Sequence, residues 1–126
     1  MMSVHGVGVD LVDLRRFDRL CDGSHERLLD RWFTTAESAA CRAASRPGRA
    51  FAETFAVKEA VWKALGVTDW DGRVPWAWIE VDAAPSPPQV RISGPVALHC
   101  PPGVHVTVGA VTSTGEVAAA VATATC

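Results

Sequence analysis

The chain has 126 residues, of which 48% are hydrophobic and 21% charged, and this fits one globular domain with a single core. A net charge of −2 argues against a duplex nucleic-acid-binding protein, which needs a strongly basic face. No segment approaches the roughly 20 apolar residues of a membrane span, and the N-terminus lacks the features of a secretion signal. We therefore expect a single domain over residues 1–126 of a cytoplasmic protein, without nucleic-acid or membrane partners.

The N-terminal pattern predicts a strand followed by a helix. In GVGVDLVDL, residues 6–14, apolar residues alternate with Gly6, Gly8 and Asp10, which is the period of a strand with one buried face. Asp10 shares a face with two glycines, so another backbone or a ligand can approach closely there. Asp13 precedes apolar residues at helical spacing and is predicted to cap the first helix.

Three further helices are predicted in the first half of the chain. Ser24 is predicted to open the second helix. Thr34 and Glu37 have the spacing of a capping box ahead of the third. The longest helix is predicted over residues 50–65, and Gly66 marks its end.

The second half of the chain changes to the period of β-strands. The predicted strands cover residues 76–82, 89–93, 105–111 and 116–122. TSTG is predicted to join the last two as a hairpin, and residues 94–100 are expected to form a short helical turn. Helices in the N-terminal half, packed on a mainly antiparallel sheet with an additional N-terminal strand, predict an α+β domain.

The cysteines are scattered through the chain. They are Cys21, Cys41, Cys100 and Cys126, with no CxxC pair among them. This spacing argues against a zinc site and predicts reduced thiols that pack as small apolar side chains.

The charges of the longest predicted helix are unusual. The chain has ten arginines but only two lysines, and both lie in FAETFAVKEAVWKALGV, residues 51–67. At about 100° per residue, Glu59 and Lys63 lie about 40° apart on a face flanked by Phe55 and Trp62. Most of the remaining helix surface is apolar, so this helix is predicted to be largely buried and Glu59 needs a partner.

Two interpretations of these charges remain open. In the first, Glu59 and Lys63 form a helical pair worth about 0.2–0.5 kcal/mol, and Lys58 is solvated. In the second, Asp10 meets Glu59 from outside the helix. Two carboxylates at a strand–helix junction suit Mg²⁺, which takes one or two carboxylates together with waters and substrate phosphates. Lysines on the same helix would then contact a phosphate ester.

Two blocks of the sequence resemble a known family. FAVKEAVWKALG at residues 55–66 and GVDLVDLRRF at residues 8–17 resemble the signatures of the holo-acyl-carrier-protein synthase type of 4′-phosphopantetheinyl transferase. The resemblance extends over nearly the whole chain. It implies transfer of the 4′-phosphopantetheine arm of coenzyme A to a serine of an acyl or polyketide carrier protein, as in fatty acid or polyketide biosynthesis. It also implies Mg²⁺ as cofactor and a homotrimer with its sites between subunits.

The resemblance further implies roles for individual residues. Asp10 and Glu59 are expected to bind the metal and, together with Lys63, to form the catalytic set. Lys58 and Lys63 match family lysines and are expected to contact coenzyme A. The residues expected on the surface that binds the acidic carrier protein are Arg15, Arg16 and Arg19. The base that removes the serine proton stays open, with Glu59 as one candidate.

The sequence departs from the family pattern at two places. Thr54 replaces an arginine, and Gly109 and Ala110 replace a serine and a histidine. The residues expected to compensate in binding coenzyme A are Arg46, Arg49 and His105. The alternative interpretation is a homologue with weak or no transferase activity that acts as a carrier-protein or coenzyme A binding module.

Overall fold

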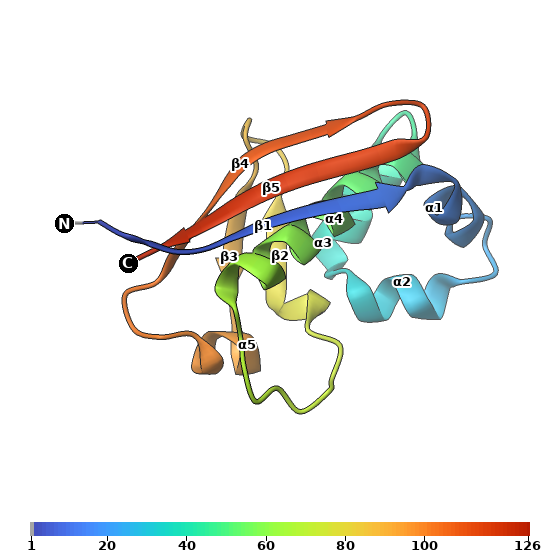
Figure 1. Ribbon diagram of the computed structural model, residues 1–126. Helices are drawn as coiled ribbons and strands as arrows, with labels where there is room; N and C mark the ends of the chain where they lie inside the picture. Colours follow the sequence, from blue (N-terminus) through green and yellow to red (C-terminus); the bar gives the residue numbers. More distant parts are fainter. Residues whose placement is uncertain (1) are drawn as a thin grey trace.

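The computed structural model describes residues 2–126, which form two antiparallel sheets and five α-helices. In chain order the elements are β1 (Val4–Asp13), α1 (Leu14–Leu20), α2 (Glu26–Trp32), α3 (Thr35–Ala43), α4 (Pro47–Leu65), the 3₁₀ turn η1 (Trp76–Trp78), β2 (Ile79–Asp82), β3 (Gln89–Ile92), α5 (Gly94–His99), β4 (His105–Ser113) and β5 (Val117–Thr125). This arrangement, seen in Figure 1, confirms the predicted α+β class.

The larger sheet joins the two ends of the chain. Its strand order is β1-β5-β4, and β2 pairs with β3 in a separate hairpin. Asp10 lies opposite Ala120 on β5, and Ala120 lies opposite Val111 on β4. Asp10 is therefore on an edge strand, and Val111 is level with it two strands away.

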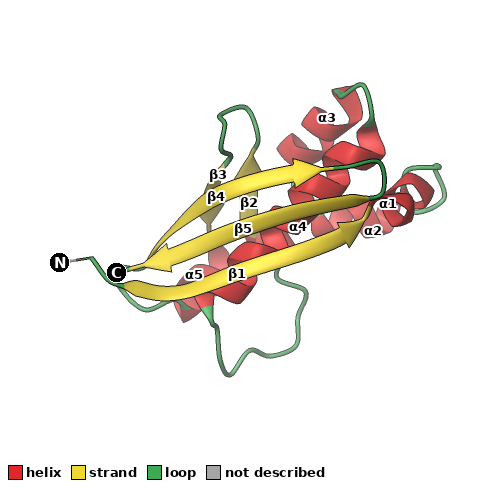
Figure 2. Ribbon diagram, turned by 45° about the horizontal axis from the view of Figure 1, so that its top comes forward, coloured by secondary structure: helices red, strands yellow, loops and turns green. Residues whose placement is uncertain are grey.

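Helix α4 lies against one face of this sheet, as Figure 2 shows. Pro47 begins the helix, where its missing N–H costs no helical hydrogen bond. Gly66 ends it in the left-handed conformation, with φ of 60°, which confirms the predicted end. Most of the side chains of α4 are buried, as the largely apolar sequence predicts. None of the helices in residues 2–126 combines the length and hydropathy that a membrane crossing requires.

Two glycines bring β1 very close to α4. A Cβ atom on Gly8 would lie 1.8 Å from the carbonyl oxygen of Ala60, and one on Gly6 would lie 2.1 Å from that of Ala64. These distances are far below van der Waals contact, so no larger residue fits without moving the helix. The sequence predicted that another backbone or a ligand approaches the glycine face of this strand, and the structure places the backbone of α4 there.

The opposite face of β1 is apolar and exposed in the single chain. Val7, Val9 and Leu11 are 58%, 57% and 70% exposed. On the neighbouring strand, Ala119 and Val121 are only partly buried, whereas Ala118 and Ala120 face the core. The glycine face of β1 is therefore the buried one. The apolar face forms an outer surface of the single chain, and an exposed apolar surface of this kind is typical of a contact with another chain.

A phenylalanine cluster fills the core between α1, α4 and the end of α2. The rings of Phe33 and Phe51 lie 4.9 Å apart at 72°, and those of Phe17 and Phe55 lie 5.4 Å apart. Edge-to-face and tilted contacts of this kind add to the burial of apolar area. They fix α1 against the side of α4 that also carries Glu59.

The local signals at helix ends are mostly confirmed. Asp13 accepts a hydrogen bond from the backbone N–H of Arg15, at 2.9 Å, and caps α1. Thr34 and Glu37 form the predicted capping box at the start of α3. Residues 94–100 contain the short helix expected there, α5.

Several predicted boundaries are wrong; α4 begins at Pro47 rather than at residue 50, and β5 ends at Thr125 rather than at residue 122. The second helix begins at Glu26 rather than at Ser24, because the Ser24 side chain bonds to Asp22 within a turn and does not cap a helix. Residues 76–78 form a 3₁₀ turn, so the predicted strand over residues 76–82 is restricted to its last four residues.

Candidate active site

Asp10 and Lys63 meet where β1 crosses α4. The Lys63 Nζ atom lies 2.7 Å from Asp10 Oδ1 and donates to the carbonyl oxygen of Val9 at 2.9 Å. The Asp10 side chain is 9% exposed, whereas that of Lys63 is 51% exposed. The pair thus has a buried acidic end and a basic end that reaches solvent.

Glu59 lies one helical turn before Lys63 and is the second carboxyl group of the site. Burial, followed by the negative charge of Asp10, raises the pKa of Glu59 from 4.5 to about 7. The positive charges of Lys63 and Arg16 act in the opposite direction. The structure therefore brings together Asp10, Glu59 and Lys63, the set that the sequence predicts.

The two carboxyl groups fit a divalent cation. Among the buried side-chain atoms of residues 2–126, Asp10 Oδ2 is one that lacks a hydrogen-bond partner. A cation shared with Glu59 would give this oxygen a partner and remove the repulsion between the carboxyl groups. Residues 2–126 contain no group of three or more His, Cys, Asp or Glu side chains arranged for a metal. Two carboxylates with room for water suit Mg²⁺ better than a cation that needs a complete protein cage.

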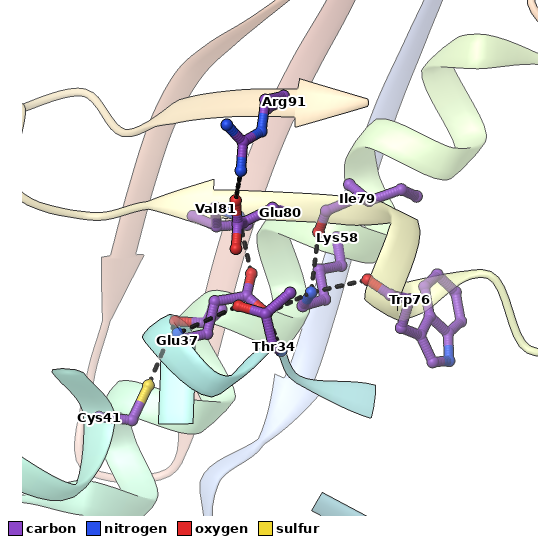
Figure 3. Close-up of polar contacts among 10 residues, drawn as sticks. Thr34, Glu37, Cys41, Lys58, Trp76, Ile79, Glu80, Val81 and Arg91 are labelled. Atoms are coloured by element: carbon purple, nitrogen blue, oxygen red, sulfur yellow. Dashed lines mark hydrogen bonds and ion pairs between the residues drawn. The ribbon is translucent and has the colours of Figure 1, made fainter. Parts of the chain in front are cut away.

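Lys58 precedes Glu59 and is fully buried. Its Nζ atom donates to Glu37 Oε1 at 2.8 Å and to the carbonyl oxygens of Trp76 and Ile79, at 2.7 and 2.8 Å. Figure 3 draws these contacts as dashed lines. An ammonium group has three donors, and all three are used here. The expectation that Lys58 contacts coenzyme A is therefore corrected: this lysine is an internal structural group with no donor left for a ligand.

Arg49 and His105 do not join Asp10 within one chain. Arg49 donates to the carbonyl oxygen of Thr114, beyond the end of β4, at 3.4 Å. His105 begins β4, and Asp10 is level with Val111 in the sheet. At about 3.3 Å per residue, His105 lies roughly 20 Å along the strand from that level. Any contribution of His105 to the site of Asp10 requires a second copy of the chain.

Arg16 stands over an aromatic surface beside the site. Its guanidinium carbon lies 5.4 Å from the Trp32 ring centroid and 5.9 Å from that of Phe55. Its positive charge also acts to lower the pKa of Glu59. The other two arginines of α1, also exposed, are Arg15 and Arg19. The predicted carrier surface therefore adjoins the carboxylates.

Thr54 lines a cavity of about 800 Å³ between α3, α4 and the β2–β3 hairpin. Its Oγ1 atom lies 3.6 Å from the buried Cys41 Sγ. The one basic residue among those that line the cavity, Arg91, is paired with Glu80. Thr54, which stands where the family pattern has an arginine, thus faces a mainly apolar cavity. Within residues 2–126, no unpaired basic side chain lines this cavity.

Glu37, the ion-pair partner of Lys58, has a second role that the sequence pattern did not reveal. Glu37 was predicted only as a capping residue, but its carboxylate also accepts from Lys58 and from the N–H of Val81, at 2.7 Å. No spacing rule relates these positions, because their contact depends on how α3 packs on α4.

Comparisons with known proteins agree with this fold. Residues 6–122 match the 4′-phosphopantetheinyl transferase superfamily. The holo-[acyl-carrier-protein] synthase of Chlamydia trachomatis serovar L2 is 37% identical over 119 residues, covering 94% of this chain and 98% of that protein. The Moorella thermoacetica synthase is 47% identical over 74 residues, covering 59% of this chain and 56% of that protein. The matched part thus spans little more than half the length of the Moorella relative.

A solved structure extends the likeness in fold. The Helicobacter pylori holo-[acyl-carrier-protein] synthase in complex with coenzyme A superposes with a TM-score of 0.70 at 20% identity, covering 94% of this chain and 98% of that one. The match over residues 6–122 places the chain in the 4′-phosphopantetheinyl transferase superfamily, and the solved structure agrees with its α+β fold. Within that superfamily, the chain belongs to the holo-[acyl-carrier-protein] synthase family.

Proposed function

We propose that this chain transfers the 4′-phosphopantetheine group of coenzyme A to a serine hydroxyl of an acyl or polyketide carrier protein, with Mg²⁺ held by Asp10 and Glu59. The observation that supports this proposal is the convergence of both carboxyl groups with Lys63, where a buried oxygen of Asp10 lacks a partner among residues 2–126. The names of the family relatives support the same co-substrates.

The reaction is a displacement at phosphorus. The serine oxygen attacks the phosphorus atom next to the pantetheine, the bond from this phosphorus to the bridging oxygen breaks, and adenosine 3′,5′-bisphosphate leaves with the electron pair. The hydroxyl proton passes to a base or to solvent. Such transfers depend mainly on positioning and charge neutralisation, and Mg²⁺ bound at the carboxylates would neutralise the diphosphate.

Lys63 supplies the second positive charge for the diphosphate. Its ammonium group has three donors, and within residues 2–126 it donates to Asp10 and to the Val9 carbonyl. The third donor is available to a phosphate oxygen, because half of this side chain is exposed. Lys63 thereby holds Asp10 in place and contacts the substrate as a point charge.

We also propose that three copies assemble with the sites between them. The exposed face formed by Val7, Val9 and Leu11 is a continuous apolar surface on an edge strand. Arg49 and His105 lie away from the carboxylates of their own chain, so they serve the site of a neighbouring copy. The family resemblance supports three as the number of copies.

Transfer is tested by incubating the protein with coenzyme A, Mg²⁺ and a panel of apo carrier proteins. The expected result is a mass gain of one phosphopantetheine on one serine, which is abolished by chelating Mg²⁺. A native protein that binds coenzyme A in calorimetry, but modifies no carrier, would favour the binding-module alternative.

The departures from the family pattern are tested by restoring the family residues. Thr54→Arg, alone or with Ala110→His, increases transfer if the coenzyme pocket has lost its phosphate contacts. If the parent is fully active and both changes are harmful, the chain has a different pocket for the nucleotide. An inactive parent that neither change improves would again favour the binding module.

A further inference from the structure

We infer that Glu37 and Lys58 are positioning residues: their buried ion pair fixes α4 against residues 76–82 and so sets where Glu59 and Lys63 face Asp10. This inference rests on the proposed function, because a position matters to catalysis only if the site works. Neither residue is assigned any contact with substrate or metal.

The Glu37 carboxylate joins three elements. Oε1 accepts from the backbone N–H of Thr34 and from Lys58 Nζ, each at 2.8 Å. Oε2 accepts from the backbone N–H of Val81 at 2.7 Å. Both oxygens are occupied, and Figure 3 shows this carboxylate between the start of α3, α4 and strand β2.

Lys58 completes the link through main-chain acceptors. Besides Glu37, it bonds to the carbonyl oxygens of Trp76, in η1, and Ile79, at the start of β2. Main-chain acceptors cannot change rotamer to follow a moving lysine. Three directional bonds to one buried ammonium group therefore hold α4 at one rotation about its axis.

The contact between α4 and β1 has few interlocking side chains. At its centre Gly6 and Gly8 on the strand lie against the buried Ala60 and Ala64 on the helix, while other residues of α4 pack on β5 and β4. Residues without long side chains form a smooth surface with few interlocking ridges and grooves. The bonds of Lys58 on another side of α4 add directional contacts that further restrict the rotation of the helix.

Small rotations of α4 would matter at the site. Side-chain ends lie about 5 Å from a helix axis, so a rotation of about 20° moves them by about 2 Å. Misplacement of a reacting group by about 1 Å can cost about 100-fold in rate. Because Lys58 and Glu59 are adjacent on α4, a change at the buried pair is transmitted directly to the carboxylate.

The stability of the fold does not by itself require an ion pair between Glu37 and Lys58. Replacing a buried pair by apolar groups of similar volume is often neutral or stabilising, whereas removing one partner leaves an uncompensated buried charge. A structural role and a positioning role therefore make different predictions for single and double variants.

The test uses Lys58→Met alone and Lys58→Met combined with Glu37→Gln. The single variant is expected to melt at a lower temperature, and the double variant to recover most of that loss. In the double variant kcat is expected to remain at least tenfold below the parent, with the KM values for coenzyme A and carrier changed less than threefold. Glu80→Gln with Arg91→Met, which removes the ion pair between β2 and β3, is the matched control and is expected to retain the parent kcat.

A measurement of helix orientation, made without metal or substrate, tests this inference independently of the proposed function. Residual dipolar couplings on the metal-free protein are expected to show α4 turned relative to β1 and β5 in the double variant but not in the control. Parental orientation together with parental kcat would overturn the inference. If the parent is inactive but α4 turns in the double variant, the proposed transferase function is refuted. The inference that Glu37 and Lys58 set the orientation of α4 is then retained. Should the double variant unfold, Glu37→Asp, which keeps the charge but shortens the side chain, is compared with the parent by the same two measurements.

Discussion

The ammonium group of Lys63 lies 2.7 Å from the carboxylate of Asp10 and also donates to the carbonyl oxygen of Val9, so the long helix and the first strand are joined at the proposed catalytic site. Lys63 balances one of the two carboxylates. When Glu59 is ionised, one negative charge remains, and a divalent cation is favoured there.

Asp10→Asn and Glu59→Gln are each expected to abolish Mg²⁺-dependent transfer while leaving the fold intact, because each removes a metal-binding charge but little volume. We expect a loss of at least about 100-fold in kcat/KM, which corresponds to about 2.7 kcal/mol. Mass spectrometry of the carrier measures transfer, and circular dichroism checks the fold. Asp30→Asn, an exposed carboxylate on α2, is the control. Full activity of either site variant would contradict the assignment.

Glu59 is expected to titrate near pH 7 in the metal-free protein, because burial and the Asp10 carboxylate both raise its pKa to about 7. Carboxyl carbon shifts followed by NMR measure this directly. Asp10→Asn should lower the pKa only in part, because burial, the larger cause, remains. Lys63→Met should raise it, because it removes an opposing positive charge. A pKa near the ordinary value of 4.5 in the parent would contradict the close approach of these carboxyl groups.

The same raised pKa implies a dependence of stability on pH. The folded protein holds the Glu59 proton more tightly than the unfolded chain does, so this contribution is fully present below pH 4.5 and is lost as the pH rises through about 7. The metal-free parent should therefore lose more thermal stability between pH 5 and pH 8 than Glu59→Gln does. Mg²⁺ should recover that loss at pH 8. Equal pH dependence in the two proteins would show that Glu59 is not responsible.

Gly8→Ala is expected to destabilise the domain by about 3 kcal/mol or more, because the new Cβ would lie 1.8 Å from the Ala60 carbonyl oxygen and neither backbone can yield easily. Gly115→Ala is the matched control. A Cβ there meets nothing within 4 Å, so we expect a change within about 0.5 kcal/mol. Urea unfolding measures both values, and equal stability of the two variants would refute the close packing of β1 on α4.

Leu11→Glu is expected to convert the proposed trimer to single chains, because it places a charge on the apolar outer face of β1, where Leu11 is 70% exposed in one chain. Light scattering after size-exclusion chromatography measures the mass. Leu98→Glu on α5, where the leucine is 87% exposed, should leave the assembly unchanged. A parent that is already monomeric at micromolar concentration would end the trimer proposal.

Arg16→Glu is expected to raise the KM for the carrier protein about tenfold, which corresponds to about 1.4 kcal/mol, and to raise the KM for coenzyme A much less. The reason is reversal of a charge that faces an acidic partner beside the carboxylates. Arg42→Glu on α3 is the control, since Arg42 also lies over an aromatic ring, that of Phe51. Unchanged carrier kinetics with an intact fold would assign Arg16 to a solvated helix face.

Local sequence signals predicted much of this fold. The caps formed by Asp13 and Thr34 obey short-range rules, and the end of α4 at Gly66 follows from the freedom of glycine to adopt a positive φ. The approach of Asp10 to α4 was predictable because glycines on the same strand face leave room for another backbone.

Features that depend on packing between distant parts of the chain could not be predicted from local sequence signals. The role of Lys58 could not be read from the helix that carries it, because its partners Glu37 and Trp76 come from other elements. Alternation in β1 predicted one buried face, but the choice of the glycine face depends on α4. The positions of Arg49 and His105 relative to the carboxylates involve neighbouring copies under our proposal, which the pattern of a single chain does not encode.

The pairing of β1 with β5 has a consequence for synthesis in the cell. Among the strands of residues 2–126, β1 leaves the ribosome first, and its pairing partner in the sheet, β5, begins at Val117, after the other elements. At about 5–20 residues per second, β1 waits roughly 5–20 s without a neighbour. Throughout that interval the nascent chain exposes an edge strand with three apolar side chains on one face, a target for chaperones and for premature aggregation.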